Sequence, residues 1–346
     1  MNVAIADRDP VTRLAGLALE YDASSEQWVH EYFSAEGDAA PKELAEIALS
    51  ARDLSARVQQ GSYDGATVVI VRRGTFDAAF FARHPTVRFI QKIGRWPDGI
   101  DLVSAANAGC TVATLPRASL ARTAEHALLL MLAAGKAVRR AADRMEQGIV
   151  VAGARPQDDV CYNWTGSTTA GLLGETIGLV GVGEVGGELA LRLRPFEAKV
   201  LYTKRHRLSS EEERFFGVEW AELETLLAVS RYVSLHLPYS SATQHWMDAA
   251  KFSKMRTDGY FINLSRGKIV DEAALYAALT SGRLAGAALD VHSVEPAPWD
   301  ALRRLDNVFV TPHVAGGARS HLLSEIRTIV DNLRNFAKGD KVRFKC

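Results

Sequence analysis

Three polar residues in the second half of the sequence follow apolar, strand-like segments, and together they could move a proton and hold a carboxylate. Arg266 follows "FINLS", Glu295 lies in a short loop after "AALDV", and His313 follows "VFVTP". Ligands of open α/β sheets bind at the carboxyl ends of the strands, so we expect these residues to face one crevice. Histidine beside a carboxylate is an acid/base pair, and arginine grips a carboxylate with two hydrogen bonds. Taken singly, each also has a structural interpretation: an exposed arginine, a capping glutamate and a loop histidine.

A glycine-rich segment precedes these residues and favours dinucleotide binding. In "TIGLVGVGEVGGELALRL" a buried strand leads to Gly181, Gly183 and Gly186, and then to a helix. The first glycine permits a tight turn, the second lets the backbone approach a pyrophosphate, and the third allows close packing. The N–H groups of Glu184 and Val185, at the helix start, would face the phosphates. A purely structural turn and an S-adenosylmethionine site are the alternatives.

The end of the next strand, "KVLYTKRHR", bears on the choice of nicotinamide cofactor. A carboxylate is expected about 20 residues after the glycines, where it would bind the ribose hydroxyls. Thr203, Lys204 and Arg205 stand there instead, and they offer a hydroxyl and two cations to a 2'-phosphate. We therefore expect NADP(H) to be preferred, with NAD(H) possible. Arg205 is favoured over Lys204 and Arg207 for the contact, and a merely solvated basic loop is the alternative.

The rest of the chain alternates strand-like and helix-like segments, as α/β proteins with parallel sheets do. In the first 118 residues, short apolar runs alternate with helical patterns, including one over 41–61. A long helix is predicted over 119–148, a loop over 151–171, and then a second alternating series that fits a doubly wound sheet.

Composition narrows the class of protein. The 346 residues are 47% hydrophobic, enough for two ordinary domains, and 41 basic residues balance 41 acidic ones. We therefore expect no nucleic-acid partner and no membrane partner. The three cysteines show no C-x-x-C spacing, which predicts reduced thiols in a cytoplasmic protein and no metal site. The first residues lack a signal-peptide pattern, and no apolar run is long enough to span a bilayer.

Several motifs, read together, resemble one enzyme family. They are "TAEHALLLMLA", "GETIGLVGVGEVG", "HLPYSSAT", "NLSRGKIVDEAAL", "GAALDVHSVEP" and "NVFVTPHVAG". With them, the sequence from about Phe89 to Gly339 is similar to the D-isomer-specific 2-hydroxyacid dehydrogenases, which include phosphoglycerate dehydrogenase, glyoxylate/hydroxypyruvate reductase and formate dehydrogenase. The resemblance implies that Arg266 binds the substrate carboxylate, His313 is the acid/base and Glu295 its partner. It also implies that Pro238 and Asp290 contact the nicotinamide side of the cofactor.

The resemblance further implies two doubly wound parallel-sheet domains. A Rossmann-type nucleotide domain, residues 119–319, is inserted in a flavodoxin-like substrate domain formed by residues 1–118 and 320–346. It also implies a homodimer formed through the nucleotide domains, and a small 2-oxo or 2-hydroxy carboxylic acid as substrate.

One loop departs from the family pattern. Where relatives carry a small segment such as "GVGVDNID", this chain has "KIGRWPDGID", residues 92–101. Arg95 and Trp96 are bulky, and Pro97 removes a backbone donor. Either the loop takes another path, or Trp96 shapes a pocket for a particular substrate. Arg95 is expected either to bind a second anionic group of the substrate or to face outward.

Other polar and aromatic residues have weaker claims to function. Glu125 and His126 resemble half of a metal motif, but helix capping or packing is favoured for both. His236 is expected to be structural or close to the cofactor. Trp164 fits either a neighbouring subunit's active site or a dimer interface.

The sequence thus predicts a 2-oxo-acid reductase. The alternatives are phosphoglycerate dehydrogenase-type activity and a nicotinamide-sensing, corepressor-like binding protein on the same fold.

Overall fold

In the computed structural model the chain folds into two compact units. The structure describes residues 1–346 except 8, 35–38, 152–162, 164, 168 and 299. Unit 1 comprises residues 1–119 and 317–346, and unit 2 comprises residues 120–316. Trp164 and most of the loop predicted over 151–171 therefore lie outside the described residues.

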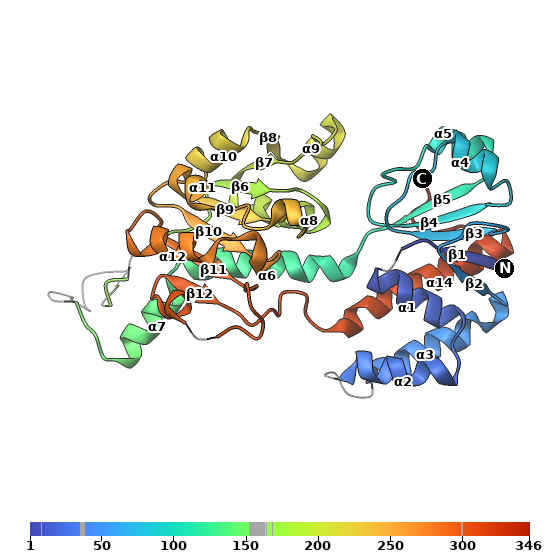
Figure 1. The fold of residues 1–346 in the computed structure, drawn as a ribbon, viewed down its shortest axis with the longest axis horizontal. Helices are drawn as coiled ribbons and strands as arrows, with labels where there is room; N and C mark the ends of the chain where they lie inside the picture. Colours follow the sequence, from blue (N-terminus) through green and yellow to red (C-terminus); the bar gives the residue numbers. More distant parts are fainter. Residues whose placement is uncertain (8, 35–38, 152–162, 164, 168, 299) are drawn as a thin grey trace. The chain divides into compact units, whose positions relative to one another are not determined.

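Unit 1 is built on a parallel five-stranded sheet with the order β2-β1-β3-β4-β5 (Figure 1). This is the flavodoxin-like order, as predicted. The strands are β1 (Asn2–Ile5), β2 (Arg57–Gln60), β3 (Val68–Val71), β4 (Phe89–Ile93) and β5 (Thr111–Leu115). All four residues of β3 are buried, as expected for a strand covered on both faces.

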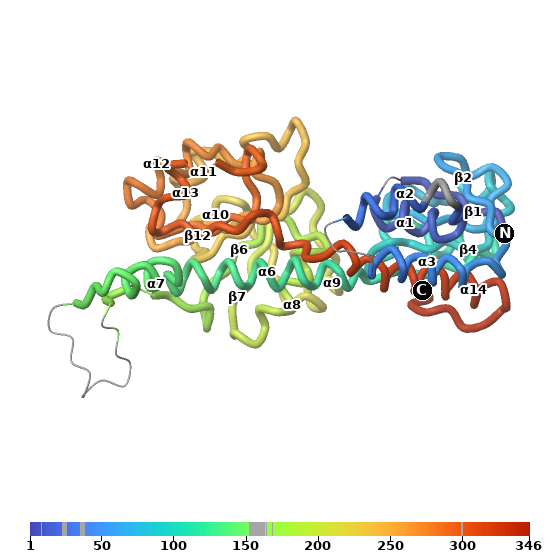
Figure 2. The backbone as a smooth tube through the Cα atoms, turned by 90° about the horizontal axis from the view of Figure 1, so that it is seen from below, coloured from blue at the N-terminus to red at the C-terminus, as the bar shows by residue number. Residues whose placement is uncertain are grey.

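Helices cover both faces of this sheet. Val3, Ile5 and Val68 belong to one core with the helices α1, α2, α3 and α14. Ala4 and Val69 point to the other face, where α4 and α5 pack. Figure 2 shows α14 beside α3, so the last helix of the chain returns to the first unit. The bounds are α1 (Pro10–Leu19), α2 (Ala23–Tyr32), α3 (Ala39–Ala51), α4 (Ala78–Arg83), α5 (Leu102–Asn107) and α14 (Leu323–Lys338).

The helical pattern predicted over 41–61 is wrong in its second half. α3 ends at Ala51, and Ser55 takes a left-handed conformation with φ 44°. The chain then forms β2, which adds to the sheet edge beside β1. The sequence "RVQQ" contains one apolar residue, so its pattern carried no strand signal.

Unit 2 is built on a parallel seven-stranded sheet with the order β12-β11-β10-β9-β6-β7-β8 (Figure 1). This is the Rossmann order, and its direction reverses between β6 and β9. The predicted class of two doubly wound parallel-sheet domains is therefore confirmed. The two-residue strand β8 was not expected. The strands are β6 (Thr176–Val180), β7 (Lys199–Thr203), β8 (Glu219–Trp220), β9 (Tyr232–Leu235), β10 (Tyr260–Asn263), β11 (Gly286–Leu289) and β12 (Val308–Val310).

The helices of unit 2 bury apolar residues against this sheet. Leu226, Phe252 and Leu275 share one core with Val233 and Phe261 of the central strands. α6 starts in unit 1 and buries Leu130 and Met131 in unit 2. The bounds are α6 (Ala118–Gly135), α7 (Val138–Glu146), α8 (Glu184–Leu193), α9 (Ser210–Phe216), α10 (Leu223–Val229), α11 (Ala249–Lys254), α12 (Glu272–Thr280) and α13 (Ala301–Arg304).

The single helix predicted over 119–148 is two helices. α6 ends at Gly135, where a Cβ would lie 2.1 Å from the Tyr232 hydroxyl. Ala137 is left-handed, with φ 49°, and α7 starts after it. The helix thus ends beside a close contact with β9, in a sequence whose pattern is helical throughout. Within the described part of the chain, no helix is long and apolar enough to cross a membrane.

Candidate active site

Glu295 and His313 form a hydrogen-bonded pair in unit 2. Glu295 lies in the loop after β11 and His313 follows β12, the neighbouring strand. His313 Nδ1 lies 2.7 Å from Glu295 Oε2, and both side chains are about two-fifths exposed. With Nδ1 bound to the carboxylate, proton exchange with a bound molecule falls to Nε2.

The surroundings of Glu295 favour its ionised form. Burial opposes ionisation, but the hydrogen bonds from His313 and from the His292 N–H outweigh it, so the pKa of Glu295 is below its usual range. An ionised Glu295 accepts the hydrogen bond of the His313 ring and holds the ring in one orientation. The pair can therefore act as an acid/base.

Arg266 lies just after β10, the strand next to β11. Its side chain is exposed, donates to the Ser265 carbonyl at 2.5 Å, and forms no ion pair with any described residue. Asn263 shapes the turn, because its Oδ1 accepts the Ser265 N–H and its Nδ2 donates to the Arg266 carbonyl. The guanidinium is thus available to an anion.

Gly267 brings the Arg266 segment against the loop that carries Glu295. A Cβ at Gly267 would lie 1.9 Å from the carbonyl carbon of His292 and 2.4 Å from the Ser293 nitrogen. Any larger residue would separate the two segments. The structure therefore holds Arg266, Glu295 and His313 on adjoining segments of one unit.

Asp290 is fully buried at the end of β11, and its carboxylate holds the loop that follows His313. It accepts hydrogen bonds from the Thr311 hydroxyl at 2.6 Å and from the N–H groups of Val314 and Ala315, both at 2.9 Å. His126 of α6 lies beside it, 3.0 Å from the Thr311 hydroxyl. The contact between Asp290 and the nicotinamide stays a prediction.

A cavity of about 670 Å³ borders the acid/base pair. Both members of the pair line it, with Pro296, Val310 and Pro312 among the neighbouring walls. A small organic acid can therefore reach the pair.

The glycine-rich segment connects β6 to α8. Gly181 has φ 92°, and a Cβ there would lie 2.9 Å from the His236 carbonyl oxygen. A Cβ at Gly186 would lie 2.8 Å from the Gly181 carbonyl, so these two glycines permit close packing. Gly183 has open space instead, and no side chain caps the helix that starts at Glu184. The first N–H groups of α8 therefore fit an anion.

His236 and Pro238 follow β9, which lies next to β6. Burial lowers the pKa of His236 to about 4, and its Nε2 lies 2.9 Å from the Ser234 hydroxyl. A neutral, hydrogen-bonded ring agrees with a structural role for His236. The Pro238 carbonyl accepts a hydrogen bond from the Thr243 hydroxyl at 2.9 Å.

The basic residues after β7 differ in their availability. Arg207 binds Glu213 with two hydrogen bonds, of 2.8 and 3.2 Å, and its guanidinium lies 5.5 Å from the Trp220 ring centre. Arg205 is exposed and Lys204 half-buried, and neither side chain pairs with a described residue. These two cations are therefore available to a ligand and Arg207 is not.

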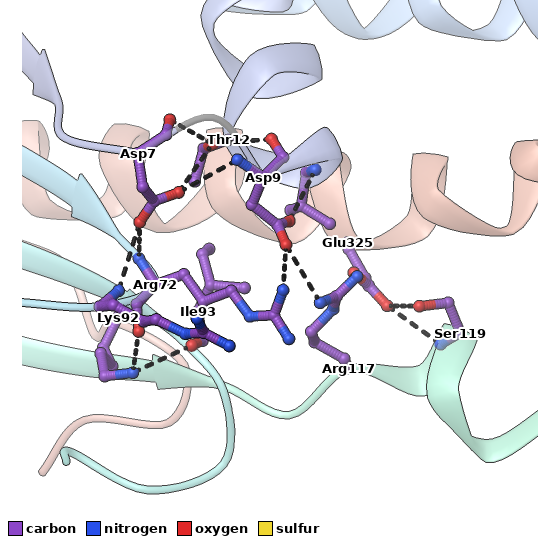
Figure 3. A network of polar contacts seen from close by, with 11 residues as sticks. Asp7, Asp9, Thr12, Arg72, Lys92, Ile93, Arg117, Ser119 and Glu325 are labelled. Atoms are coloured by element: carbon purple, nitrogen blue, oxygen red, sulfur yellow. Dashed lines mark hydrogen bonds and ion pairs between the residues drawn. The ribbon is translucent and has the colours of Figure 1, made fainter. Parts of the chain in front are cut away.

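The loop with Arg95 and Trp96 belongs to unit 1 and follows β4. Gly94 exchanges two hydrogen bonds with Leu115, and the side chains of Arg95 and Trp96 are half-buried. The buried Lys92 anchors the loop base, because its Nζ donates to the carbonyls of Arg72 and Ile93 (Figure 3).

Charged side chains beside this loop pair with one another. Arg72 and Arg117 both approach the buried Asp9, at 2.5 and 3.5 Å (Figure 3). Glu325 of α14 accepts hydrogen bonds from the N–H and hydroxyl of Ser119 at the start of α6. The network fixes the carboxyl edge of the unit 1 sheet.

Among the described residues, no group of three or more His, Cys, Asp or Glu side chains could hold a metal ion.

The sequence prediction missed Asn263, His292 and Arg303, which support the predicted site residues through hydrogen bonds. Nothing in their local spacing distinguishes them from ordinary strand-end and helix residues. The contacts appear only when separate segments come together in the fold.

The chain is similar to known proteins. Residues 128–315 match the family model described as "D-isomer specific 2-hydroxyacid dehydrogenase, NAD binding domain". The chain is 35% identical over 279 residues to a D-3-phosphoglycerate dehydrogenase of Archaeoglobus fulgidus, covering 80% of this chain but only 50% of that protein. It is 33% identical over 265 residues to a glyoxylate reductase of Korarchaeum cryptofilum, covering 76% of this chain and 77% of that protein.

A solved structure is similar as well. The formate dehydrogenase of Granulicella superposes with a TM-score of 0.53 at 28% identity, over 85% of this chain and 80% of that one.

Proposed function

This chain belongs to the D-isomer-specific 2-hydroxyacid dehydrogenase family, and from that premise we propose that it reduces a small 2-oxo acid to the 2-hydroxy acid. The observation that carries the proposal is the 2.7 Å contact between Glu295 and His313, in the same unit as the glycine-rich loop. Glyoxylate and hydroxypyruvate are the substrates proposed first.

The chemistry requires a hydride and a proton. A nicotinamide cofactor, when bound, supplies the hydride to the carbonyl carbon. His313 Nε2 donates a proton to the carbonyl oxygen, so that C=O becomes CH–OH, and Glu295 stabilises the protonated ring before the transfer. His313 then regains a proton from water. Arg266 binds the substrate carboxylate and orients the carbonyl.

The open space at Gly183 and the uncapped start of α8 support cofactor binding in unit 2. Gly181, Glu184, Val185 and Gly186 complete the pyrophosphate loop in this proposal. We accordingly assign residues 119–319 to dinucleotide binding and residues 1–118 with 320–346 to the substrate domain. Substrate binding by Arg95 and Trp96, homodimer formation and a cytoplasmic location stay predictions.

NADP(H) is the proposed cofactor, with NAD(H) as the alternative. Lys204 and Arg205 lie beyond β7, their cations pair with none of the described residues, and Thr203 adds a hydroxyl. Because Arg207 is bound to Glu213, the proposed 2'-phosphate contacts fall to Lys204 and Arg205.

A second candidate is phosphoglycerate dehydrogenase-type activity. It is favoured by the 35% identity to the Archaeoglobus fulgidus protein, of which this chain spans half.

A panel of 2-oxo acids assayed with NADH and with NADPH tests both assignments. We expect turnover of glyoxylate or hydroxypyruvate, and its loss without loss of cofactor binding in His313→Ala and Arg266→Ala. The exposed His30 of unit 1 provides a control, since His30→Ala should retain turnover. Turnover of 3-phosphohydroxypyruvate alone would favour the second candidate, and no turnover of any acid would refute the proposal.

The cofactor assignment has its own variants and a matched control. Lys204→Ala and Arg205→Ala should each raise KM for NADPH by about 10- to 100-fold, because a charge-assisted hydrogen bond contributes roughly 1.5–3 kcal/mol. Arg207→Ala should leave the NADPH/NADH preference unchanged. A wild-type kcat/KM higher with NADH than with NADPH would refute the NADP(H) assignment.

A further inference from the structure

A buried arginine lies behind the acid/base pair. Arg303 of α13 is 1% exposed, and its guanidinium has three different partners. Nη1 donates to Asp300 at 2.6 Å, Nη2 to Glu272 of α12 at 3.0 Å, and Nε to His292 Nδ1 at 3.1 Å. Burying a cation this deeply is costly, and replacing a whole buried charge cluster with apolar residues of similar volume is often neutral for stability. Stability alone is therefore a weak reason for this cluster.

Arg303 fixes the tautomer of His292. A guanidinium only donates hydrogen bonds, so the Nδ1 atom that it contacts must accept and carries no proton. The ring proton is then on Nε2, which lies 3.0 Å from the Thr311 carbonyl oxygen and donates to it. His292 thereby ties the loop after β11 to the end of β12, two residues before His313.

The same short segment contacts the rest of the predicted site. The His292 N–H donates to Glu295 Oε1 at 3.0 Å, which fixes the carboxylate whose other oxygen binds His313. Glu272 accepts the N–H and the hydroxyl of Ser293, both at 2.9 Å. The segment with Gly267 packs on the 292–293 peptide, directly after Arg266.

We propose that His292 and Arg303 are positioning residues for proton transfer. They hold the Glu295 carboxylate at a fixed position relative to the loop that carries His313. The inference rests on the proposed reductase function. Each residue acts through hydrogen bonds: His292 touches both segments of the acid/base pair, and Arg303 locks His292 between them.

The test compares His292→Phe, His292→Gln and Arg303→Met with wild type, using glyoxylate and hydroxypyruvate with NADPH. A small displacement of a proton donor can cost about 100-fold in rate, so kcat should fall roughly 10- to 100-fold in His292→Phe and Arg303→Met. Because these residues lie away from the glycine loop, KM for NADPH should not change. His292→Gln keeps a donor that can reach the Thr311 carbonyl and should recover part of kcat.

Arg231→Met is the matched control. Arg231 also pairs with two carboxylates, Glu175 at 3.2 Å and Asp258 at 3.5 Å. It directly precedes the central strand β9, so it lies at the amino ends of the strands, whereas the site lies at their carboxyl ends. Its loss should lower the urea midpoint and leave kcat unchanged. If the Arg303→Met protein does not fold, the two His292 variants carry the test.

The outcomes separate the two proposals. The positioning role is overturned if His292→Phe keeps the kcat of the wild type, or if its kcat falls no more than that of Arg231→Met. Either result leaves the reductase proposal standing. Absence of turnover in the unaltered protein overturns both.

Discussion

We predict that the buried carboxylate of Asp290 holds the loop that follows His313, and that losing one of its oxygens weakens this loop. Oδ1 accepts hydrogen bonds from the Thr311 hydroxyl and the Val314 N–H, and Oδ2 accepts the hydrogen bond from the Ala315 N–H. Asp290→Asn keeps the size of the side chain but replaces one of these oxygens with an amino group, which can only donate. If the amide oxygen takes the place of Oδ1, the buried Ala315 N–H loses its acceptor.

The magnitude follows from that single lost acceptor. An unsatisfied buried donor costs about 1–3 kcal/mol. With an m-value of about 2 kcal/mol per molar urea, a loss of about 2 kcal/mol lowers the unfolding midpoint by about 1 M. Because the loop next to His313 loosens, kcat should also fall by about 10-fold or more.

Urea unfolding followed by circular dichroism, combined with steady-state kinetics, measures both effects. The transition of unit 2 is identified as the one that added NADPH shifts to higher urea. Asp258→Asn is the control, because Asp258 is about two-fifths exposed and its ion pairs should contribute at most about 1 kcal/mol. A midpoint and kcat in Asp290→Asn equal to those of the control would refute the reasoning.

Three further predictions concern buried or hydrogen-bonded groups. Glu325→Ala removes the buried carboxylate that binds Ser119. It should lower the free energy of unfolding of unit 1 by about 3–5 kcal/mol without changing NADPH affinity. A loss of less than about 1 kcal/mol, measured by urea unfolding, would contradict this. The pKa of Glu295 is below its usual range because hydrogen bonds outweigh burial. Ionised Glu295 therefore stabilises the folded protein above about pH 4.3, and this contribution is lost as the pH falls through the pKa of Glu295 in the folded protein. A fall of kcat/KM towards acid that begins at higher pH and disappears in Glu295→Gln would contradict this. Burial raises the pKa of Cys110 to about 12, so iodoacetamide at about pH 8 should label the exposed Cys346 and reach Cys110 only after unfolding, as peptide mass spectrometry can check.

The fold was largely predictable because its signals are local. Buried strands such as β3 and β6 are largely apolar runs, and the glycines after β6 mark a turn, with close packing at Gly181 and Gly186. The break at Ala137 was not predictable, since the sequence pattern is helical there and the nearby contact of Gly135 with Tyr232 comes from another strand. The edge strands β2 and β8 are short and partly polar, so their sequences carry no strand pattern.

The candidate site likewise contains residues that the sequence predicted and residues that it did not. The positions of Glu295 and His313 at strand ends predicted a shared crevice, and the structure brings them within hydrogen-bond distance. Spacing alone left open which basic residue would contact the proposed 2'-phosphate. The ion pair of Arg207 with Glu213 leaves Lys204 and Arg205 as the candidates. His292 and Arg303 were not predicted, because a hydrogen bond between a loop and a later helix leaves no periodicity in the sequence.

Transfer of deuterium from the cofactor tests the central proposal most directly. Glyoxylate or hydroxypyruvate is incubated with NADPH deuterated at the reactive position of the nicotinamide, and the product is analysed by mass spectrometry. We predict that the unaltered protein places deuterium on C2 of the 2-hydroxy acid, and that His313→Ala binds NADPH but does not. A product without deuterium, or undiminished transfer by His313→Ala, would contradict the assignment of Glu295 and His313 as the acid/base pair of a 2-oxo-acid reductase.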